Sequence, residues 1–500
     1  MYTPDSVVYL CNVPLEADQK NQLHFGSVSA QTNYFESTVV KELAGFTFVR
    51  RDSAIRCPEN IEDLYNCNYV MYQNSHFTDK WFYAFITELE YLNDAVTAIH
   101  IKTDVFQTWM FEAEILPSFV VREHTNNDAI GANTIPENLE IGPYMCLIEQ
   151  NYNLNDGGSK IVVASQALTV GDSGGTVVDN VFSGVNYQFY DTTNYQSVND
   201  FILARTEDNK ADSIVAILQV PSFIERGGDI INAPSIPGSF QGYIPKNNKL
   251  YTFPYCYMGV TANMGEEKMY RFENFTNTPK FGLATHMSLN PTAILYPYDY
   301  LGIENDLSNS IYFQPFTQCS WTSNTFAQWY SARANQIGVG FAEDIIKTAV
   351  GVGQMVVSGG MTGAGGAISG ITSIVNSLAQ MEDIKTAAPR FNGANGNTGG
   401  APFSWGTYKL TFKSYGIKAE YARCVDEFFS MFGYKTNRVK VPNIGTRQNW
   451  NYVQTVDIQI TGAIPNDDMS ELRDIYNSGV TIWNNPETFG DYSQNNGIVS

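Results

Sequence analysis

One segment of the chain limits the possible folds more than any other feature. Between Lys347 and Glu382 there is no charged residue, and eight of the intervening positions are glycine. A membrane-spanning helix needs about 20 apolar residues, so the segment is long enough to cross a bilayer. Each glycine, however, costs about 1 kcal/mol in a helix interior. The composition therefore argues against one straight spanning helix.

The segment divides better into two apolar arms, 344–358 and 367–379, joined by a glycine-rich tip. In the second arm apolar residues recur at intervals of three and four, which is typical of one helical face. Within the longer region 338–400, the residues that we expect to insert into a membrane are Ile345, Ile346, Val350, Val352, Val356, Val357, Met361, Ile368, Ile371, Ile374, Val375 and Leu378.

Charged residues stand at the outer end of each arm and form the predicted base of the loop: Glu343, Asp344, Lys347, Glu382, Asp383 and Lys385. If the arms fold back on each other, these charges meet and the uncharged tip projects away from them. Such a hairpin could enter a bilayer as far as its charged base. The residue pattern alone leaves two alternatives open, a glycine-rich hairpin buried in a soluble core and a disordered segment.

The rest of the chain indicates a mainly β protein with some α structure. A chain of 500 residues is too long for one small core, and Tyr and Phe, which favour strands, each occur 30 times. We divide it into an N-terminal β domain (1–150), a less regular β-rich region (151–248), a second β-rich unit (249–337), the glycine-rich loop (338–400) and a C-terminal α/β part (401–500).

Local patterns predict individual elements within these parts. Strands are expected at 69–72, 80–88, 99–105, 160–163, 214–218, 452–460 and 480–483. Helices are expected at 105–114, 418–432 and 467–476, the second of them ended by Gly433. Proline residues predict a linker at 232–248.

Charge and cysteine usage exclude several classes of protein. The formal net charge of −21 disfavours a general nucleic-acid binder. An acidic wall could let DNA slide past, but composition alone favours plain solubility as the reason for the charge. The seven cysteines are scattered without a CxxC pair, and the five histidines form no ligand cluster, so no metal or other cofactor is expected. The N-terminus also lacks the basic and apolar regions of a signal peptide.

The sequence GDSGG at 171–175 matches the surroundings of the nucleophile in chymotrypsin-like proteases, which would make Ser173 the nucleophile. His24 and Asp63 are the available base and orienting acid. His24 lacks the usual Ala-Ala-His-Cys surroundings, and Gly, Asp and Ser are ordinary turn residues. We therefore expect a turn here and no catalytic residue in the chain.

Motifs near both ends of the chain resemble the tail knob, or distal tail tube, proteins of small short-tailed phages of Gram-positive bacteria. The N-terminal motifs are Tyr91–Asp94, Thr103–Met110, Pro117–Val120 and Arg122–His124. The C-terminal motifs are Met431–Lys435, Val439–Asn443, Asn449–Val453 and Gly479–Pro486. They follow the family's order, with the glycine-rich segment between them.

The resemblance implies tail-tube-like β-barrels assembled into a homohexameric ring, with an inserted helical or irregular hydrophobic loop. It implies that the loop, 338–400, plugs the lumen and later forms a pore in the host cytoplasmic membrane. Implied partners are other copies of the chain, other tail and collar proteins, host membrane lipid, and viral DNA that passes without sequence-specific binding. The implied location is the distal tail of the virion. A chymotrypsin-like protease and a passive tail component remain the alternatives.

Overall fold

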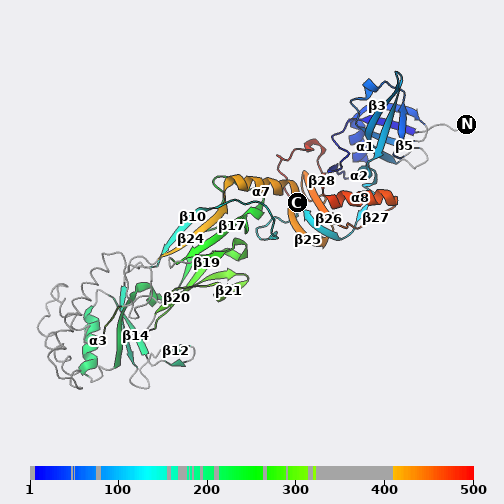
Figure 1. Ribbon diagram of the computed structural model, residues 1–500. Helices are drawn as coiled ribbons and strands as arrows, with labels where there is room; N and C mark the ends of the chain where they lie inside the picture. The colour runs from blue at the N-terminus through cyan, green and yellow to red at the C-terminus, as the bar shows by residue number, and fades with distance from the viewer. Residues whose placement is uncertain are drawn as a thin grey trace. The chain divides into compact units, whose positions relative to one another are not determined.

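The computed structural model describes residues 6–46, 49, 51–74, 80–154, 159–166, 177–178, 181–182, 185–191, 195–207, 213–262, 267–288, 291–313, 319–321 and 409–499. The chain forms two compact units, each built from separate stretches of sequence (Figure 1). Unit 1 consists of Met1–Pro143, Ser239–Tyr255 and Ile417–Ser500, and unit 2 of Tyr144–Gly238 and Cys256–Gly416. The described elements are mainly strands, as the composition predicted.

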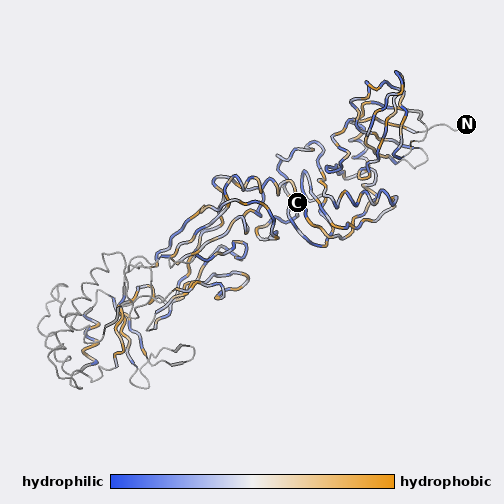
Figure 2. Tube along the Cα trace, viewed as in Figure 1, coloured by the Kyte–Doolittle hydropathy of each residue, from blue (hydrophilic) through white to orange (hydrophobic). Residues whose placement is uncertain are grey.

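Unit 1 contains a six-stranded antiparallel sheet in the order β3-β1-β5-β6-β7-β4. Its strands are β1 (Ser6–Cys11), β3 (Val39–Phe46), β4 (Ala54–Cys57), β5 (Tyr69–Asn74), β6 (Trp81–Asn93) and β7 (Val96–Thr103). Hydrophobic and hydrophilic residues are interspersed in this sheet (Figure 2), and β5 is buried on both faces, because Tyr69–Tyr72 are all buried and neighbouring side chains point to opposite faces. One face buries a core that includes Val8, Leu10, Val70 and Ile99. The strands predicted at 69–72 and 80–88 are confirmed.

A second sheet in unit 1 combines the two ends of the chain in the order β2-β28-β26-β9-β25. Its strands are β2 (Asn21–Leu23), β9 (Ser118–Glu123), β25 (Tyr434–Lys440), β26 (Trp450–Val456) and β28 (Val480–Trp483). β2 runs parallel to β28, with Asn21 opposite Thr481 and Leu23 opposite Trp483. The short strands β8 (Glu114–Ile115) and β27 (Ile460–Thr461) pair with each other.

Side-chain caps start two of the four described α-helices of unit 1, the first at Ser27 and the second at Asp104. The helices are α1 (Val28–Ser37), α2 (Val105–Trp109), α7 (Ala419–Phe432) and α8 (Asn466–Ser478), with short 3₁₀ turns η1 (Ile61–Leu64), η4 (Asn248–Tyr251) and η7 (Pro486–Thr488). The Asp104 side chain accepts the backbone N–H groups of Phe106 and Gln107, both at 3.1 Å, and so starts α2. The strand predicted at 99–105 therefore ends at Thr103, and the predicted helix 105–114 is shorter.

The two C-terminal helices are confirmed with nearly the predicted bounds, and so is β28. The strand predicted at 452–460 was wrong in its extent. Asp457 adopts a positive φ of 53°, and β26 stops before it. Ile458 then donates its backbone N–H to the Asn477 side chain of α8 instead of continuing a strand.

Unit 2 is built from three larger sheets. β10 (Tyr144–Asn153), β24 (Lys409–Ile417), β17 (Cys256–Thr261) and β18 (Glu267–Tyr270) form one, in that order. β14 (Val185–Asp191), β11 (Ser159–Gln166), β15 (Ile214–Pro221) and β23 (Cys319–Trp321) form the next. The third contains β16 (Gly228–Asn232), β19 (Phe275–His286), β20 (Thr292–Tyr300) and β21 (Ile303–Asn305), with β22 (Ile311–Tyr312) also on β20. The predicted strands 160–163 and 214–218 are confirmed.

The remaining elements of unit 2 are the pair β12 (Val177–Val178) and β13 (Val181–Phe182), the helix α3 (Tyr195–Glu207), and the 3₁₀ turns η3 (Ser222–Arg226), η5 (Phe272–Asn274) and η6 (Leu307–Asn309). Val198 and Ile202 of α3 pack on Ile161 and Val163 of β11. This contact is the core of the sheet that contains β11.

Gly433 shows how tightly the end of α7 is fixed. Its φ is 63°, and a Cβ at this position would clash with the carbonyl oxygen of Glu123 on β9.

Replacement of Gly433 by alanine is therefore expected to lower the free energy of unfolding by at least about 2 kcal/mol. Urea denaturation of G433A and of the wild type measures this change in the free energy of unfolding. The matched control is G445A, because a Cβ at Gly445 meets no atom within 4 Å. Equal stability of G433A and G445A would contradict this account of the helix end.

Candidate functional site

The membrane-insertion residues and the loop base predicted within 338–400 lie outside the described residues, as does the GDSGG sequence at 171–175. Within the described ranges, no helix is long and apolar enough to cross a membrane. Those same ranges contain no group of three or more His, Cys, Asp or Glu residues arranged to hold a metal ion.

The structure describes the other two members of the hypothetical protease triad and does not bring them together. His24 donates its backbone N–H to the carbonyl oxygen of Trp483, and its ring lies beside the Asn484 side chain. Burial lowers the pKa of His24. Asp63 lies in η1, where its charge acts on Lys41.

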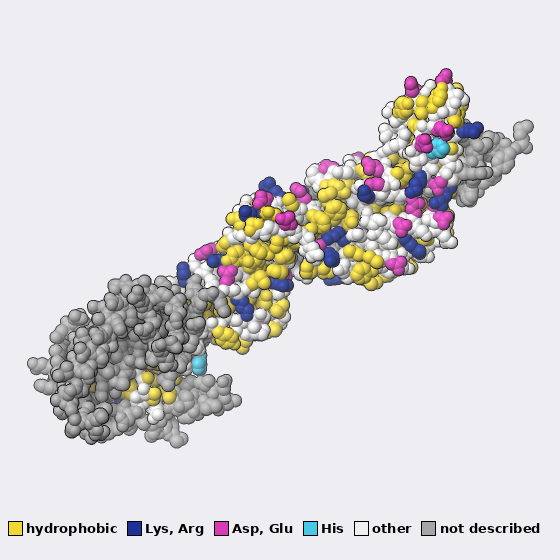
Figure 3. Space-filling view, in the orientation of Figure 1, with side chains coloured by type: hydrophobic (Ala, Val, Ile, Leu, Met, Phe, Trp, Pro, Cys, Tyr) yellow, Lys and Arg dark blue, Asp and Glu magenta, His cyan; other side chains and the backbone are white. Residues whose placement is uncertain are grey.

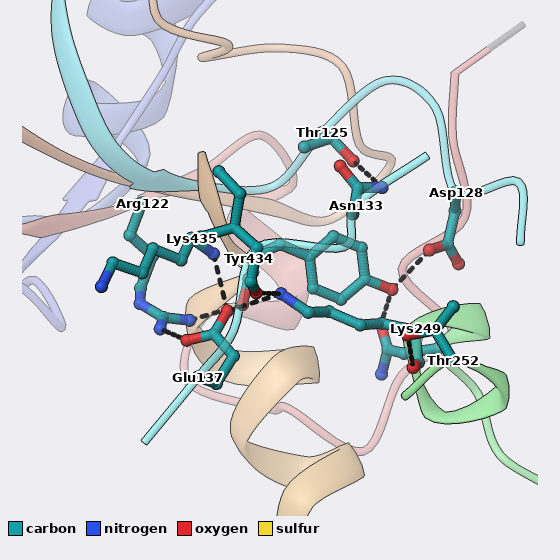
Figure 4. A network of polar contacts seen from close by, with 12 residues as sticks. Arg122, Thr125, Asp128, Asn133, Glu137, Lys249, Thr252, Tyr434 and Lys435 are labelled. Carbon is teal, nitrogen blue, oxygen red and sulfur yellow. Dashed lines mark hydrogen bonds and ion pairs between the residues drawn. The ribbon is translucent and has the colours of Figure 1, made fainter. Parts of the chain in front are cut away.

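A buried network of polar side chains in unit 1 surrounds Glu137 (Figure 4). Arg122 from β9 forms an ion pair with one carboxylate oxygen of Glu137. The other oxygen accepts from Lys249 Nζ at 2.7 Å and from the backbone N–H of Lys435 at 2.8 Å. One carboxylate therefore joins three stretches of sequence that are more than 100 residues apart.

The charges of this network are compensated inside the protein. Burial alone would raise the pKa of Glu137, but the hydrogen bonds from Lys249 and the Lys435 backbone, with the positive charges nearby, hold it below its ordinary value. Burial lowers the pKa of Lys249, while Glu137 acts in the opposite direction. Lys249 Nζ also lies 5.3 Å from the ring centroid of Tyr434. Tyr434 in turn donates its hydroxyl to Asp128 (Figure 4).

A second carboxylate, Asp426 on α7, binds the segment that returns from unit 2. It accepts from the Tyr243 hydroxyl at 2.6 Å, from the Lys246 N–H at 2.7 Å, and from both the backbone N–H and the side-chain amide of Asn247, at 3.0 and 2.8 Å. Residues 243–247 are thus fixed to a helix about 180 positions later in the chain. The chain passes from unit 2 to unit 1 between Gly238 and Ser239, inside the linker predicted at 232–248, but residues 243–247 are packed against α7 and are not a linker.

Each residue of the tripeptide Arg122–His124, one of the motifs that carries the family resemblance, makes contacts of this kind. Glu123 accepts from Lys440 Nζ at 2.6 Å and from the backbone N–H of Asn443 at 2.8 Å. His124 Nδ1 accepts the backbone N–H of Tyr452 at 2.8 Å, so the ring proton lies on Nε2, which faces the carbonyl oxygen of Ser430 at 3.0 Å. Sequence reasoning found this motif but assigned it no role.

A cavity of about 130 Å³ lies beside the network in unit 1. Its lining includes Glu123, Asn127, Asn133, Lys435, Arg438 and Lys440. Because Glu137, Asp426 and Glu123 each accept hydrogen bonds from several fixed donors, the arrangement suits the clamping of distant segments rather than proton transfer to a substrate.

The fold identifies the class of protein. The structure aligns with that of the tail knob protein gp12 of bacteriophage C1, with a TM-score of 0.61 and 15% sequence identity, over 99% of this chain and 100% of that chain. This chain therefore has the fold of a phage tail knob protein.

Sequence comparison then identifies the family. Residues 223–497 match the C-terminal domain of tail knob protein gp9 of Bacillus phage phi29, and residues 4–114 match the N-terminus of caudoviral major tail proteins. Tail knob protein gp9 of phage phi29 is 27% identical and that of phage PZA is 28% identical, each over 98% of this chain and 98% of the relative. The chain belongs to the gp9 tail knob family and is a structural component of the virion tail. These findings confirm the resemblance drawn from the terminal motifs.

The Glu137 network predicts a measurable loss of stability. Glu137→Gln leaves Arg122 and Lys249 without their buried counter-charge, which should lower the free energy of unfolding by about 3–5 kcal/mol. Chemical denaturation measures the change. Glu140→Gln is the matched control, since Glu140 is exposed three positions away. A loss no larger than that of the control would show that the network does not stabilise unit 1.

His124 predicts a dependence of stability on pH. Burial, followed by the charge of Arg447, lowers the pKa of His124 to about 3, against an ordinary value of 6.5. The unfolded chain therefore binds this proton first, and stability should fall by about 1.4 kcal/mol per pH unit as pH drops from 6.5 toward 3.

The free energy of unfolding is measured as a function of pH for the wild type and for His124→Gln, and the two curves are subtracted. The difference is needed because burial raises the pKa of Asp104 to about 6, which opposes the histidine effect between pH 4 and 6. The variant should lack the histidine contribution to the slope. Parallel stability curves for the two proteins would contradict the assignment of a neutral, buried His124.

Proposed function

We propose that this tail knob protein forms a ring whose channel conducts the viral DNA out of the virion, and that its glycine-rich loop enters the host cytoplasmic membrane as a pore. The ring is a homohexamer in contact with other tail and collar proteins. DNA passes through it without sequence-specific binding. The net charge of −21 supports this passage, since like charges keep DNA from adhering to the wall.

The observation that carries the pore proposal is the uncharged segment between Lys347 and Glu382, in a chain that belongs to a tail knob family. Before infection the arms of the loop plug the lumen, where apolar faces from several copies bury one another. In the membrane they exchange that burial for contact with lipid, so the two states can be close in free energy. Small residues let arms from neighbouring copies pack closely in the bilayer.

We further propose the five segments 1–150, 151–248, 249–337, 338–400 and 401–500 as the functional divisions of the chain. The first and last complete the tube, which is supported by the presence of Met1–Pro143 and Ile417–Ser500 in the same compact unit. The loop 338–400 is inserted between the second β-rich unit and the C-terminal part. Its charged base, from Glu343 to Lys347 and from Glu382 to Lys385, stays at the membrane surface.

Release of a dye from liposomes tests the pore. Wild type should release it, and deletion of 345–379 should abolish release while leaving assembly intact. Single charges in the arms, Val357→Lys or Ile371→Lys, should reduce release at least about tenfold, since a charge in the bilayer centre costs about 3 kcal/mol. Asn397→Lys, beyond the arms, is the matched control and should behave as wild type.

Equal leakage from wild type and the deletion would contradict the proposal. Virions that carry the deletion and still deliver their DNA would favour a passive tail component instead. A serine-reactive phosphonate that labels Ser173, with loss of a hydrolytic activity in Ser173→Ala, would favour the protease alternative.

A further inference from the structure

The outer strand β25 of the second sheet carries an exposed apolar row. Val439 on β25 lies opposite Phe119 on β9, and Phe119 lies opposite Val456 on β26. The three side chains are 71%, 41% and 56% exposed. Residues that face each other across adjacent strands form a continuous surface. Val441, just beyond β25, is exposed as well.

Positive charge lies on the opposite face of the same edge strand, because Arg438 and Lys440 alternate with Val439 along β25. Lys435, Arg438 and Lys440 of β25 line the 130 Å³ cavity. Lys440 is paired with Glu123, but Lys435 and Arg438 form no ion pair with another residue in the described ranges. At the end of the sheet order, β25 pairs only with β9 among the described strands. This edge surface, made of Phe119, Val456 and residues 435–441, is thus apolar on one face of the sheet and basic on the other.

The hairpin of β6 and β7 has the complementary character. Tyr91 and Leu92 near its turn are 53% and 40% exposed. Glu88, Glu90 and Asp94 lie beside them and are exposed too. The turn is firmly built, because Tyr91 donates its hydroxyl to Asp94 at 2.5 Å and Ala95 donates its N–H to the Asn93 side chain at 2.9 Å. On the face shown in Figure 3, acidic side chains also border hydrophobic ones on the part of unit 1 that contains β3 and β5.

We propose that the tip of the β6–β7 hairpin of one copy binds the edge surface of the next copy. Both surfaces are exposed within a single chain, so neither covers the other there. Tyr91 and Leu92 lie on the apolar row of the neighbour, and Glu88 faces its Arg438. This inference rests on the ring of the proposed function, because a contact between two different surfaces repeats head to tail and closes into a ring.

Charge favours this contact over the symmetric alternative. Two β25 edges paired with each other would bring Lys435 and Arg438 of both copies together, and like charges at an interface cost several kcal/mol. In the contact with the hairpin, the acidic side chains of one copy face these basic side chains of the next copy, so this repulsion is absent. The hairpin also covers the part of the β25 edge beyond Lys435, whose N–H Glu137 already binds, and an uncovered strand edge promotes aggregation.

A charge exchange in the full-length protein tests the contact, with the assembly mass measured by light scattering over a range of concentrations. Glu88→Arg and Arg438→Glu should each weaken association at least about tenfold. The double variant should recover most of the loss. Leu92→Asn should weaken association without a change in charge. Glu420→Arg, at an exposed position on α7, is the control and should associate as wild type.

The outcomes separate this contact from the proposed function. Assembly that is insensitive to both single reversals would overturn the contact and leave the ring standing. A double variant that stays as weak as either single variant would overturn the pairing of Glu88 with Arg438. A wild-type protein that remains a 55.7 kDa monomer at all concentrations would overturn the contact and the ring together. The dye-release assay tests the pore independently of these measurements of assembly.

Discussion

The architecture depends on the pairing of the two ends of the chain in one sheet. β2 lies beside β28, and β9 lies between β25 and β26. Behind this sheet, Trp450 and Trp483 pack in the same core as Tyr69 and Phe35 of the N-terminal part. Because the ends are joined, everything between Tyr144 and Gly416 except Ser239–Tyr255 can form a separate unit without exposing the core of the first. A long central insertion is therefore compatible with a stable frame.

Buried carboxylates complete that frame where hydrophobic packing cannot specify register. Glu137 and Asp426 each fix a returning segment by its backbone N–H groups as well as by side chains. Backbone donors identify a position along the chain rather than a residue type, so these contacts set where each segment lies. Removal of one partner leaves a buried charge or donor unsatisfied, which lowers the free energy of unfolding.

The sequence predicted elements whose signals are local. The amphipathic pattern and the terminal glycine located α7, and the acidic first turn located α8. It failed where a contact with another element decides the conformation. The residues around Asp457 do not predict that Asn477 will bind Ile458 and replace the strand. The residues around Tyr243 do not predict its hydrogen bond to Asp426. The family was found from the terminal motifs, whereas the roles of Arg122, Glu123 and His124 needed their spatial neighbours. The apolar loop stays a prediction.

The pairing of Asn21 with Thr481 also means that this sheet can be completed only near the end of chain synthesis. The second strand of this pair leaves the ribosome 460 residues after the first (481 − 21), which at about 5–20 residues per second is roughly half a minute to a minute and a half. Throughout that time Leu23 lacks the partner strand that covers it. Contacts of such separation form slowly. A prematurely terminated chain cannot complete the sheet, so only full-length copies present a finished unit 1 for incorporation into a virion.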